Sequence, residues 1–310
     1  MNSARHCIII LILANTFAAF GQPMKPPISS RINKEHPLAT DLVGYWLMNE
    51  GGGKAIYDLS GNRNTGTFYG DTKWVPGKFG SCLSFDGNAD YVNMGTLPGV
   101  LDNVSVFTIS CWVNWPIGPG NYDIVLGKYS DSTHAVSLNA NATGTYLAFS
   151  VCNGSTSYAY ISDFVLVGVW YHLVFVFDGA GATNSDRLKI YSNGQQRTLT
   201  FNGTIPSATP SIPSTPFYLG YTSSTYCLLG LLDDVMIFNR VLTASEIQQL
   251  YREPFCMFAK PPIIVTAEAP PPPAGRRRVI IIANSFRDLL PLVVFITVSA
   301  AVINSRKKRQ

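Results

Sequence analysis

A buried strand that carries two carboxylates constrains the fold more than any other feature of the sequence. Residues 228–238 form an apolar run that only Gly230 and the adjacent Asp233 and Asp234 interrupt. Such a run predicts a buried strand with one polar patch. A carboxylate inside an apolar strand is destabilising unless it is paired or bound to a cation. The fold must therefore bring a partner to Asp233 and Asp234.

A short amphipathic helix is predicted directly after this strand. Thr243 with Glu246 three residues later is the pattern of a capping box. Ile247, Leu250 and Tyr251 then fall on one helical face. We expect this helix to close the strand-rich part of the chain.

The composition favours strands and turns over helices. Only 14% of the 310 residues are charged, and Gly and Pro are frequent. One all-β domain with flanking segments fits this length, since sandwiches of roughly 200 to 250 residues are common. The net charge of +4 is concentrated in the basic clusters 276–278 and 306–309. No nucleic-acid partner is therefore expected for the sandwich.

The N-terminal end has two interpretations. Residues 1–23 are predicted to be a secretory signal peptide, because a basic start leads into the apolar run 7–13. Alternatively Met24 is the start, and the chain is not exported. Residues 24–37 are a lead-in under both interpretations. Removal of the signal leaves five of the six cysteines, an odd number that excludes a complete disulfide framework but still allows one bridge.

The C-terminal end is expected to lie outside the sandwich. Residues 259–278 are rich in proline and predict an extended linker. Residues 279–310 form an apolar and basic tail, in which 289–303 is an uncharged apolar run. This run is shorter than the roughly 20 residues of a spanning helix. A membrane anchor and a loosely ordered end both stay open.

The middle of the chain alternates as strands do. Over 107–115 the odd positions are apolar and the even ones mostly polar, and the same alternation recurs over 147–151. One face is expected in the core and the other toward solvent or a groove. Residues 170–178 are apolar on both faces, as in a central strand, and His172 is expected to be a packed strand residue.

Several segments resemble one family when they are taken in order. They are an entering strand with Trp46 at 42–50, a DLSGNRNTG loop at 58–66, a GKFGSCLSFDG segment at 77–87, and the Asp-Asp strand with its capped helix. Together they resemble the laminin-G-like, concanavalin A-like lectin and glucanase family. The resemblance covers about 38–251, and the domain is expected to span 38–258. It implies an all-β, two-sheet antiparallel β-sandwich, the jelly roll, with a short C-terminal helix.

The resemblance also implies a calcium site. Related sandwiches often hold one Ca²⁺ where the entering strand meets the closing strand. In this sequence that position corresponds to Asn49 or Glu50 together with Asp233 or Asp234. We therefore expect a structural calcium ion there.

A loop offers a second candidate for calcium. Asp58, Ser60, Asn62 and Asn64 place oxygen-bearing side chains at alternate positions, and calcium binds such oxygens. Tyr69 stands where an EF-hand would have its bidentate glutamate. The alternative is an Asx-turn, in which these side chains bond their own main chain.

Glycoside hydrolysis is the enzymatic function that this family suggests. It usually requires two carboxylates that flank the scissile bond. The glucanases of this fold carry them in an E-x-D-x-x-E-type pattern on one strand, which this sequence lacks. Asp233 and Asp234 are adjacent, and adjacent residues of a regular strand point to opposite faces. We therefore expect no enzymatic activity, with a hydrolase as the weakest alternative.

The predicted function is a non-catalytic module that binds glycan or protein ligands, with calcium holding the rim. Exposed aromatic side chains could stack on sugars, and the candidates are Tyr122, Tyr129, Tyr158, Tyr160, Tyr221 and Tyr226. The protein is expected to be secreted or on the cell surface, with membrane attachment only through the tail. The alternative is a structural or adhesion component of a surface appendage or phage particle, made from Met24.

Overall fold

The computed structural model describes most of the chain. Described are 23–258, without 118, 120–122, 142–145, 163, 165–166 and 224–225, and the short strands 263–265 and 281–283. The chain divides into two compact units, Met1–Phe258 and Ala259–Gln310. In the second unit, β20 (Ile263–Val265) pairs with β21 (Ile281–Ala283).

Two predictions for the ends of the chain lie almost wholly outside these residues. They are the signal peptide at 1–23, of which only Pro23 is described, and the apolar run at 289–303. Within the described part, no helix is long and apolar enough to cross a membrane.

Eight of the described strands form one antiparallel sheet. Its order is β14 (Gln195–Gln196), β13 (Leu188–Ser192), β12 (Trp170–Asp178), β7 (Val106–Asn114), β19 (Leu229–Phe238), β5 (Ser81–Asp86) and β4 (Lys73–Pro76), with β1 (Leu42–Trp46) paired to β19. The closing strand predicted at 228–238 is thus central, with β7 on one edge and both β5 and β1 on the other.

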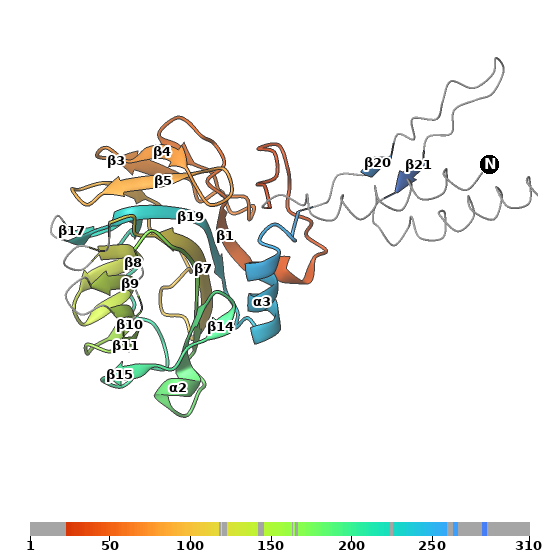
Figure 1. Cartoon of the computed structure of the whole chain (residues 1–310). Helices are drawn as coiled ribbons and strands as arrows, with labels where there is room; N and C mark the ends of the chain where they lie inside the picture. Colours follow the sequence, from red (N-terminus) through yellow and green to blue (C-terminus); the bar gives the residue numbers. More distant parts are fainter. Residues whose placement is uncertain are drawn as a thin grey trace, which may run out of the picture. The chain divides into compact units, whose positions relative to one another are not determined.

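Nine further strands form the second antiparallel sheet. Its order is β15 (Thr200–Asn202), β11 (Tyr158–Ile161), β10 (Tyr146–Asn153), β9 (His134–Asn141), β8 (Asp123–Asp131), β16 (Phe217–Leu219), β6 (Tyr91–Asn93), β3 (Gly66–Tyr69) and β2 (Ala55–Ile56). A small hairpin, β17 (Tyr221–Ser223) and β18 (Tyr226–Cys227), packs beside β8. Figure 1 shows the two sheets as facing layers. The predicted two-sheet β-sandwich is confirmed.

The space between the sheets is filled as the alternation predicts. The apolar odd positions of 107–115 and of 147–151 are fully buried in the main core. β12 is buried on both faces along almost its whole length, as expected for a central strand. The main core therefore follows directly from the period-2 pattern.

The outer face of the eight-stranded sheet is also covered, which differs from the prediction for 107–115. Thr108, Ser110 and Asn114 were expected toward solvent or a groove, but all three are buried. A second apolar cluster lies over this face, and α3 (Ala244–Arg252) contributes Ile247 and Leu250 to it. Once a helix covers a sheet, even its polar positions lose contact with water.

The helix begins as its sequence predicts. The Thr243 side chain accepts a hydrogen bond from Glu246 N, and the Glu246 carboxylate accepts one from Thr243 N. This capping box satisfies main-chain donors that a helix start leaves open. The predicted short C-terminal helix is confirmed.

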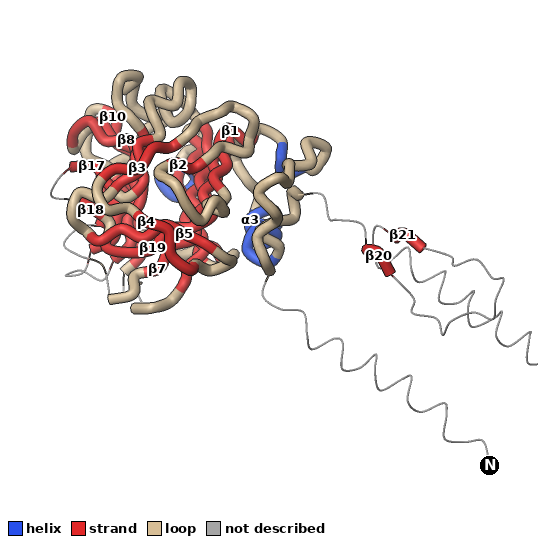
Figure 2. Tube along the Cα trace, turned by 90° about the horizontal axis from the view of Figure 1, so that it is seen from above, coloured by secondary structure: helices blue, strands red, loops and turns tan. Residues whose placement is uncertain are grey.

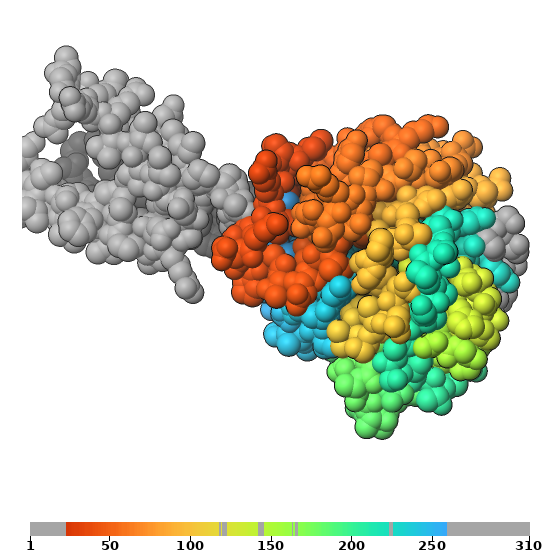
Figure 3. All heavy atoms as spheres, turned by 180° about the vertical axis from the view of Figure 1, so that it is seen from behind, coloured from red at the N-terminus to blue at the C-terminus, as the bar shows by residue number. Residues whose placement is uncertain are grey.

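The lead-in segment packs beside this helix. Ile32 forms a β-bridge with Phe258, and Asn33 N donates to Met257 O at 2.8 Å. The short 3₁₀ helix η2 (Pro37–Ala39) adds Leu38 to the second cluster. Figure 3 shows the N-terminal residues, in red, against the helix region, in blue. The lead-in is therefore part of the domain's packing.

His172 of β12 is buried, as predicted. Its Nε2 lies 2.9 Å from Ser110 Oγ, and its ring lies near Trp112 and Tyr251. Burial lowers the pKa of His172 to about 3. The imidazole is therefore neutral near pH 7 and fills space in the covered outer face.

Ile247→Ala should test the packing of α3. Ile247 is fully buried in the second cluster, so truncation should lower the free energy of unfolding by about 2–5 kcal/mol. Gln248→Ala is the matched control, because Gln248 is exposed on the same helix, and it should change stability by less than about 0.5 kcal/mol. Urea denaturation of both variants gives the comparison, and equal losses would contradict this packing.

Candidate functional site

A groove of about 220 Å³ lies on the outer face of the nine-stranded sheet. It runs over β8, β9, β10 and β11, with the β17–β18 hairpin at one side. In Figures 1 and 2, β17 lies on the side of the sandwich away from α3. The lining consists of Ile124, Tyr129, Ser132, Ala135, Ser137, Asn139, Tyr146, Ala148, Ser150, Cys152, Thr156, Tyr158, Thr222 and Tyr226.

The strand alternation builds the floor of this groove. In β9 and β10 every second residue lines the groove, while the residues between them are in the core. The two sets meet across the strands, since Ser137 pairs with Ser150 and Asn139 with Ala148. Thr156 Oγ1 donates to Ser132 O at 3.0 Å and so ties together two loops at one end. The groove is thus held by regular pairing and by one loop contact.

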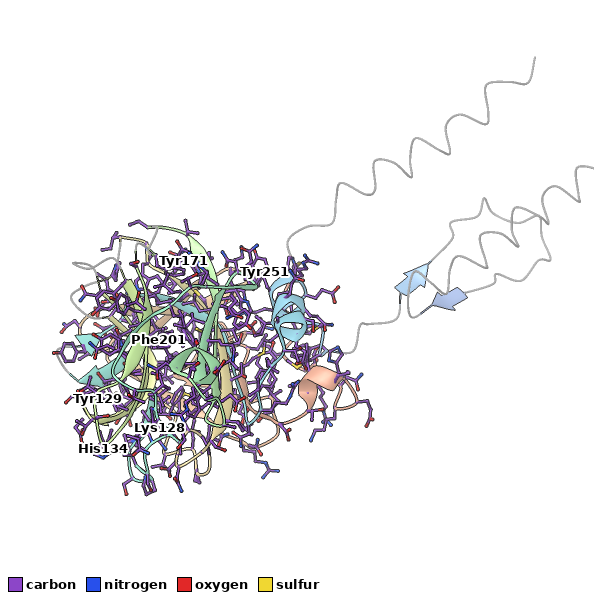
Figure 4. All side chains as sticks on the ribbon, turned by 90° about the horizontal axis from the view of Figure 1, so that it is seen from below. Lys128, Tyr129, His134, Tyr171, Phe201 and Tyr251 are labelled. Atoms are coloured by element: carbon purple, nitrogen blue, oxygen red, sulfur yellow. The ribbon has the colours of Figure 1, made fainter. Side chains whose placement is uncertain are left out.

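Three of the six tyrosines predicted as sugar-stacking candidates line the groove, namely Tyr129, Tyr158 and Tyr226. Burial, and next to it the neighbouring phenol of Tyr226, raise the pKa of Tyr129. The Tyr129 phenol is therefore neutral near pH 7. Figure 4 shows Tyr129 well separated from Tyr251 of α3.

Two further candidates, Tyr160 and Tyr221, are described but are not among the lining residues. Tyr221 stacks on Tyr91 with ring centroids 4.6 Å apart, and Tyr160 lies beside Tyr146 at 5.5 Å. Tyr122 lies outside the described residues. Exposure of a tyrosine on a strand was therefore a useful but incomplete signal.

Tyr146 and the polar groove residues of β9 and β10 were not predicted from the sequence. The signal was present in β9 and β10, where Ser, Asn and Tyr alternate with core residues. Thr222 could not be found this way, because it comes from a hairpin far along the chain. Thr222 lines the groove, and its Oγ1 is buried and has no hydrogen-bond partner among the described residues.

The chemical character of the groove is uniform. None of the lining residues that the structure describes is charged. Four are tyrosines, and six carry a hydroxyl or amide side chain. The nearby Asp131 is exposed and bonds to Thr133 and His134 in its own turn. The groove can offer ring surfaces and hydrogen bonds, but no ion pair.

The predicted carboxylate pair lies in the other sheet, at a β-bulge. Asp233 pairs with Trp112, and Met236 pairs with Ser110, so β19 has one residue more than β7 between these pairs. Asp234 has a φ of 53°, a left-handed conformation that Asp adopts more readily than most residues. The assumption of strict alternation at Asp233 and Asp234 was wrong, because the extra residue breaks it.

The partner of Asp233 is Lys25, which the sequence analysis left in the lead-in. The two side chains form an ion pair and are 2% and 0% exposed for Lys25 and Asp233. Lys25 Nζ also donates to Met48 O at 3.0 Å and to Ser81 O at 2.6 Å. Burial raises the pKa of Asp233 to about 6, and the Lys25 ammonium opposes that rise.

Asp234 is buried beside Tyr45. Burial first, and then the charge of Asp233, raise the pKa of Asp234 to about 8. Burial and the Asp234 charge raise the pKa of the Tyr45 phenol well above its usual value. At pH 7 the cluster therefore holds a neutral Asp234 and a neutral Tyr45 beside the ion pair of Asp233 with Lys25.

The two residues expected to join these aspartates have other partners. Asn49 Nδ2 donates to Pro26 O at 2.6 Å. Glu50 Oε1 accepts a hydrogen bond from Tyr57 N at 2.8 Å. Within the described ranges, no group of three or more His, Cys, Asp or Glu residues could hold a metal ion.

The DLSGNRNTG loop has the geometry of an Asx-turn. Asp58 Oδ1 accepts hydrogen bonds from Tyr45 N at 3.0 Å and Ser60 N at 2.8 Å, and Oδ2 accepts one from Asn64 N at 3.1 Å. Asn62 donates its side-chain amide to a main-chain carbonyl of β1 at 3.0 Å. These side chains fasten the loop to the entering strand, which is the alternative to calcium that the sequence left open.

The family follows from a comparison of the sequence. A profile of the concanavalin A-like lectin/glucanases superfamily matches residues 86–248, just over half of the chain. The chain belongs to this superfamily. No curated protein matches it at a significant level.

Solved structures share the superfamily fold at low sequence identity. Domain 4 of AbnA, an extracellular GH43 arabinanase from Geobacillus stearothermophilus, solved in complex with arabinotriose, is 20% identical with a TM-score of 0.51. That match covers 68% of this chain and 98% of the other. The binding domain of botulinum neurotoxin DC, solved in complex with SialylT, is 13% identical with a TM-score of 0.53.

The receptor-binding domain of botulinum neurotoxin D is 11% identical with a TM-score of 0.54. The neurotoxin matches cover 69% of this chain and only about half of the neurotoxin chains, 52% and 53%. These likenesses concern the fold.

The calcium ion that the superfamily resemblance implies does not fit at Asp233 while Lys25 is in place. A calcium ion needs roughly six to eight oxygens. The Lys25 ammonium already binds the Asp233 carboxylate and two main-chain carbonyls. A second cation beside it would be repelled, and Asn49 is turned toward Pro26.

Asp58→Ala should destabilise the domain without any dependence on calcium. The carboxylate accepts three main-chain hydrogen bonds, so its removal should lower the free energy of unfolding by about 3 kcal/mol. Asn62→Ala, which removes two exposed side-chain hydrogen bonds, should lower it by less than about 1 kcal/mol. Urea melts in EDTA and in CaCl₂ should coincide for each variant. A loss for Asp58→Ala that appears only with calcium present would refute the Asx-turn.

Asp234→Asn should change how stability depends on pH. The folded pKa of Asp234 is about 8 and its ordinary value is 3.8. Folded protein therefore keeps a proton that unfolded protein loses, and stability falls as pH rises from about 4 to about 8. The advantage of the Asn variant should grow over that window by up to about 1.4 kcal/mol per pH unit.

The matched control is Asp131→Asn, measured by denaturation at pH 5 and pH 8. Hydrogen bonds from Thr133 lower the pKa of Asp131 to about 2. It is ionised in both states over this window, so its replacement should leave the pH slope unchanged. Parallel profiles for Asp234→Asn and wild type would contradict a raised pKa at Asp234.

Proposed function

We propose that the chain is a non-catalytic carbohydrate-binding module that holds a neutral glycan in the groove over β8–β11. The observation that carries this proposal is the described part of the lining, which combines four tyrosines with six other residues that carry a hydroxyl or amide and includes no charged side chain. Sugars present apolar ring faces and hydroxyl groups together, and this lining matches both.

The buried hydroxyl of Thr222 supports a polar ligand. Buried polar atoms in folded proteins are almost always hydrogen-bonded. Thr222 lines the groove, and its buried Oγ1 lacks a partner among the residues described. A sugar hydroxyl, or a water that a sugar displaces, would satisfy it.

The absence of charge in the lining selects among glycans. An acidic sugar would bring a carboxylate into a groove with no basic side chain to pair with it, and an unpaired charge removed from water is strongly unfavourable. The volume of about 220 Å³ is below that of a typical small-molecule site. A short neutral segment, such as a chain end, therefore fits better than a broad protein surface.

The structural neighbours support a glycan ligand in general but do not identify which glycan this chain binds. One structural neighbour was solved with arabinotriose and another with SialylT, so this sandwich can present glycan sites. We propose that the module acts at the cell exterior, as expected from the predicted signal peptide.

A binding role suits the groove better than hydrolysis. Glycoside hydrolysis usually needs two carboxylates beside the scissile bond, and no Asp or Glu is among the lining residues in the described part of the chain. Asp233 and Asp234 are buried in the eight-stranded sheet, where a sugar cannot reach them.

Tyr226→Ala and Tyr129→Ala should weaken binding to neutral oligosaccharides. Each removes one ring from the groove lining, and an aromatic contact contributes about 0.5–1.5 kcal/mol beyond its buried area, so the Kd should rise roughly tenfold. The full chain would first be screened on an array of neutral and acidic glycans. Titration of the best neutral glycan would then give the Kd of each variant.

Tyr57→Ala is the matched control, because Tyr57 is 57% exposed and lies outside the groove. Its Kd should equal that of the wild type. Binding only to acidic glycans, or no loss of affinity at Tyr129 and Tyr226, would overturn the proposal.

A further inference from the structure

We propose that Lys25 is a tethered cation that takes the place of a metal ion between the strands of the eight-stranded sheet. In this proposal the lead-in segment supplies the positive charge that Asp233 needs, and the fold does not depend on calcium. Removal of the Lys25 side chain, with enough space left behind, should uncover a site for a divalent cation.

Lys25 Nζ is surrounded by oxygen atoms that accept its hydrogen bonds. An ammonium group has three N–H donors and no acceptor. Nζ binds three oxygens, which are one carboxylate oxygen of Asp233 and the carbonyls of Met48 and Ser81. All three donors are thus used, in a cage that consists only of oxygen atoms.

The oxygen cage lies where β19 passes from one strand partner to the next. β5 pairs with β19 up to Leu232, and β1 pairs with it from Val235 onward. Between these pairs the edge of β19 has no strand partner, and Asp233 lies in that gap. Ser81 begins β5, and Met48 comes shortly after β1 ends. The gap between two strands therefore gathers oxygens around one point.

The buried carboxylate of Asp233 requires a positive charge beside it. Asp233 is fully buried, and removing one partner of a buried ion pair is strongly destabilising. Asp233 Oδ2 is also buried and has no hydrogen-bond partner within the described structure. The caged carboxylate therefore has a second oxygen that Lys25 leaves unused, and a divalent cation can bind both oxygens of one carboxylate.

Hydrogen bonds hold the main chain on both sides of the Lys25 side chain. Lys25 N donates to Phe79 O at 3.3 Å. Asn49 Nδ2, expected from the sequence to serve a calcium ion, instead donates to Pro26 O at 2.6 Å. Two of the residues predicted for calcium, Asn49 and Asp233, are therefore both used to hold the lead-in.

The test compares Lys25→Ala with Lys25→Met in the full chain, by thermal melting in EDTA and in millimolar CaCl₂. Both variants lack the charge, so in EDTA the Tm of each should fall by roughly 10 °C. Alanine leaves the cage open, and calcium should recover most of that loss. The methionine side chain fills the cage, so calcium should recover nothing.

Wild type should show no calcium-dependent change in Tm, because Lys25 already fills the cage. Terbium luminescence should detect a bound ion in Lys25→Ala but not in wild type or Lys25→Met. The double variant Lys25→Ala/Asp233→Asn should also bind no terbium, because it lacks the carboxylate. An equal calcium shift in wild type and Lys25→Ala would overturn the proposal. So would a Tm of Lys25→Ala in EDTA that equals that of wild type.

A variant that does not fold also gives an answer. Lys25→Ala/Asp233→Asn removes both charges and should fold in EDTA. If this double variant folds while Lys25→Ala fails to refold in both EDTA and calcium, the cage does not accept a divalent ion and the proposal is overturned. Refolding of Lys25→Ala only with calcium supports it.

Discussion

The ion pair between Lys25 and Asp233 is the interaction on which the centre of the eight-stranded sheet depends. β19 is the strand that joins β7 to both β5 and β1, and its bulge places a carboxylate where the two edge partners separate. A bare carboxylate there would be in an apolar environment without water. The ammonium of Lys25 allows β19 to continue from one partner to the other, and so allows one sheet instead of two fragments.

The covering of one sheet decides where a ligand can bind. The outer face of the eight-stranded sheet is closed by α3 and by the lead-in, which Lys25 fastens at one point and the bridge of Ile32 with Phe258 at another. The outer face of the nine-stranded sheet carries the groove instead. Polar residues on the two outer faces therefore differ in how far they are exposed to solvent. Thr108 is buried under the covering layer, while Asn139 is only partly buried and lines the groove.

The fold was predictable because regular alternation and a capping box are local signals. The odd positions of 107–115 and the start of α3 could be assigned from neighbouring residues alone. The bulge at Asp234 could not, because one extra residue in a strand leaves no clear mark in composition. Lys25 could not be found either, since its partner is 208 residues away. For the groove, Tyr129 was a local signal, but Thr222 becomes part of the site only when a distant hairpin packs beside β8.

A tethered cation and a bound metal ion differ in what they make the fold depend on. A metal ion stabilises the folded state by an amount that varies with its concentration. Lys25 is part of the chain, so its local concentration is set by the short connection to the sheet and not by the surroundings. The stability of the sandwich then depends on the presence of the lead-in, while the groove on the opposite sheet takes none of its lining from that segment. Ligand binding and the charge balance of the core can therefore vary independently.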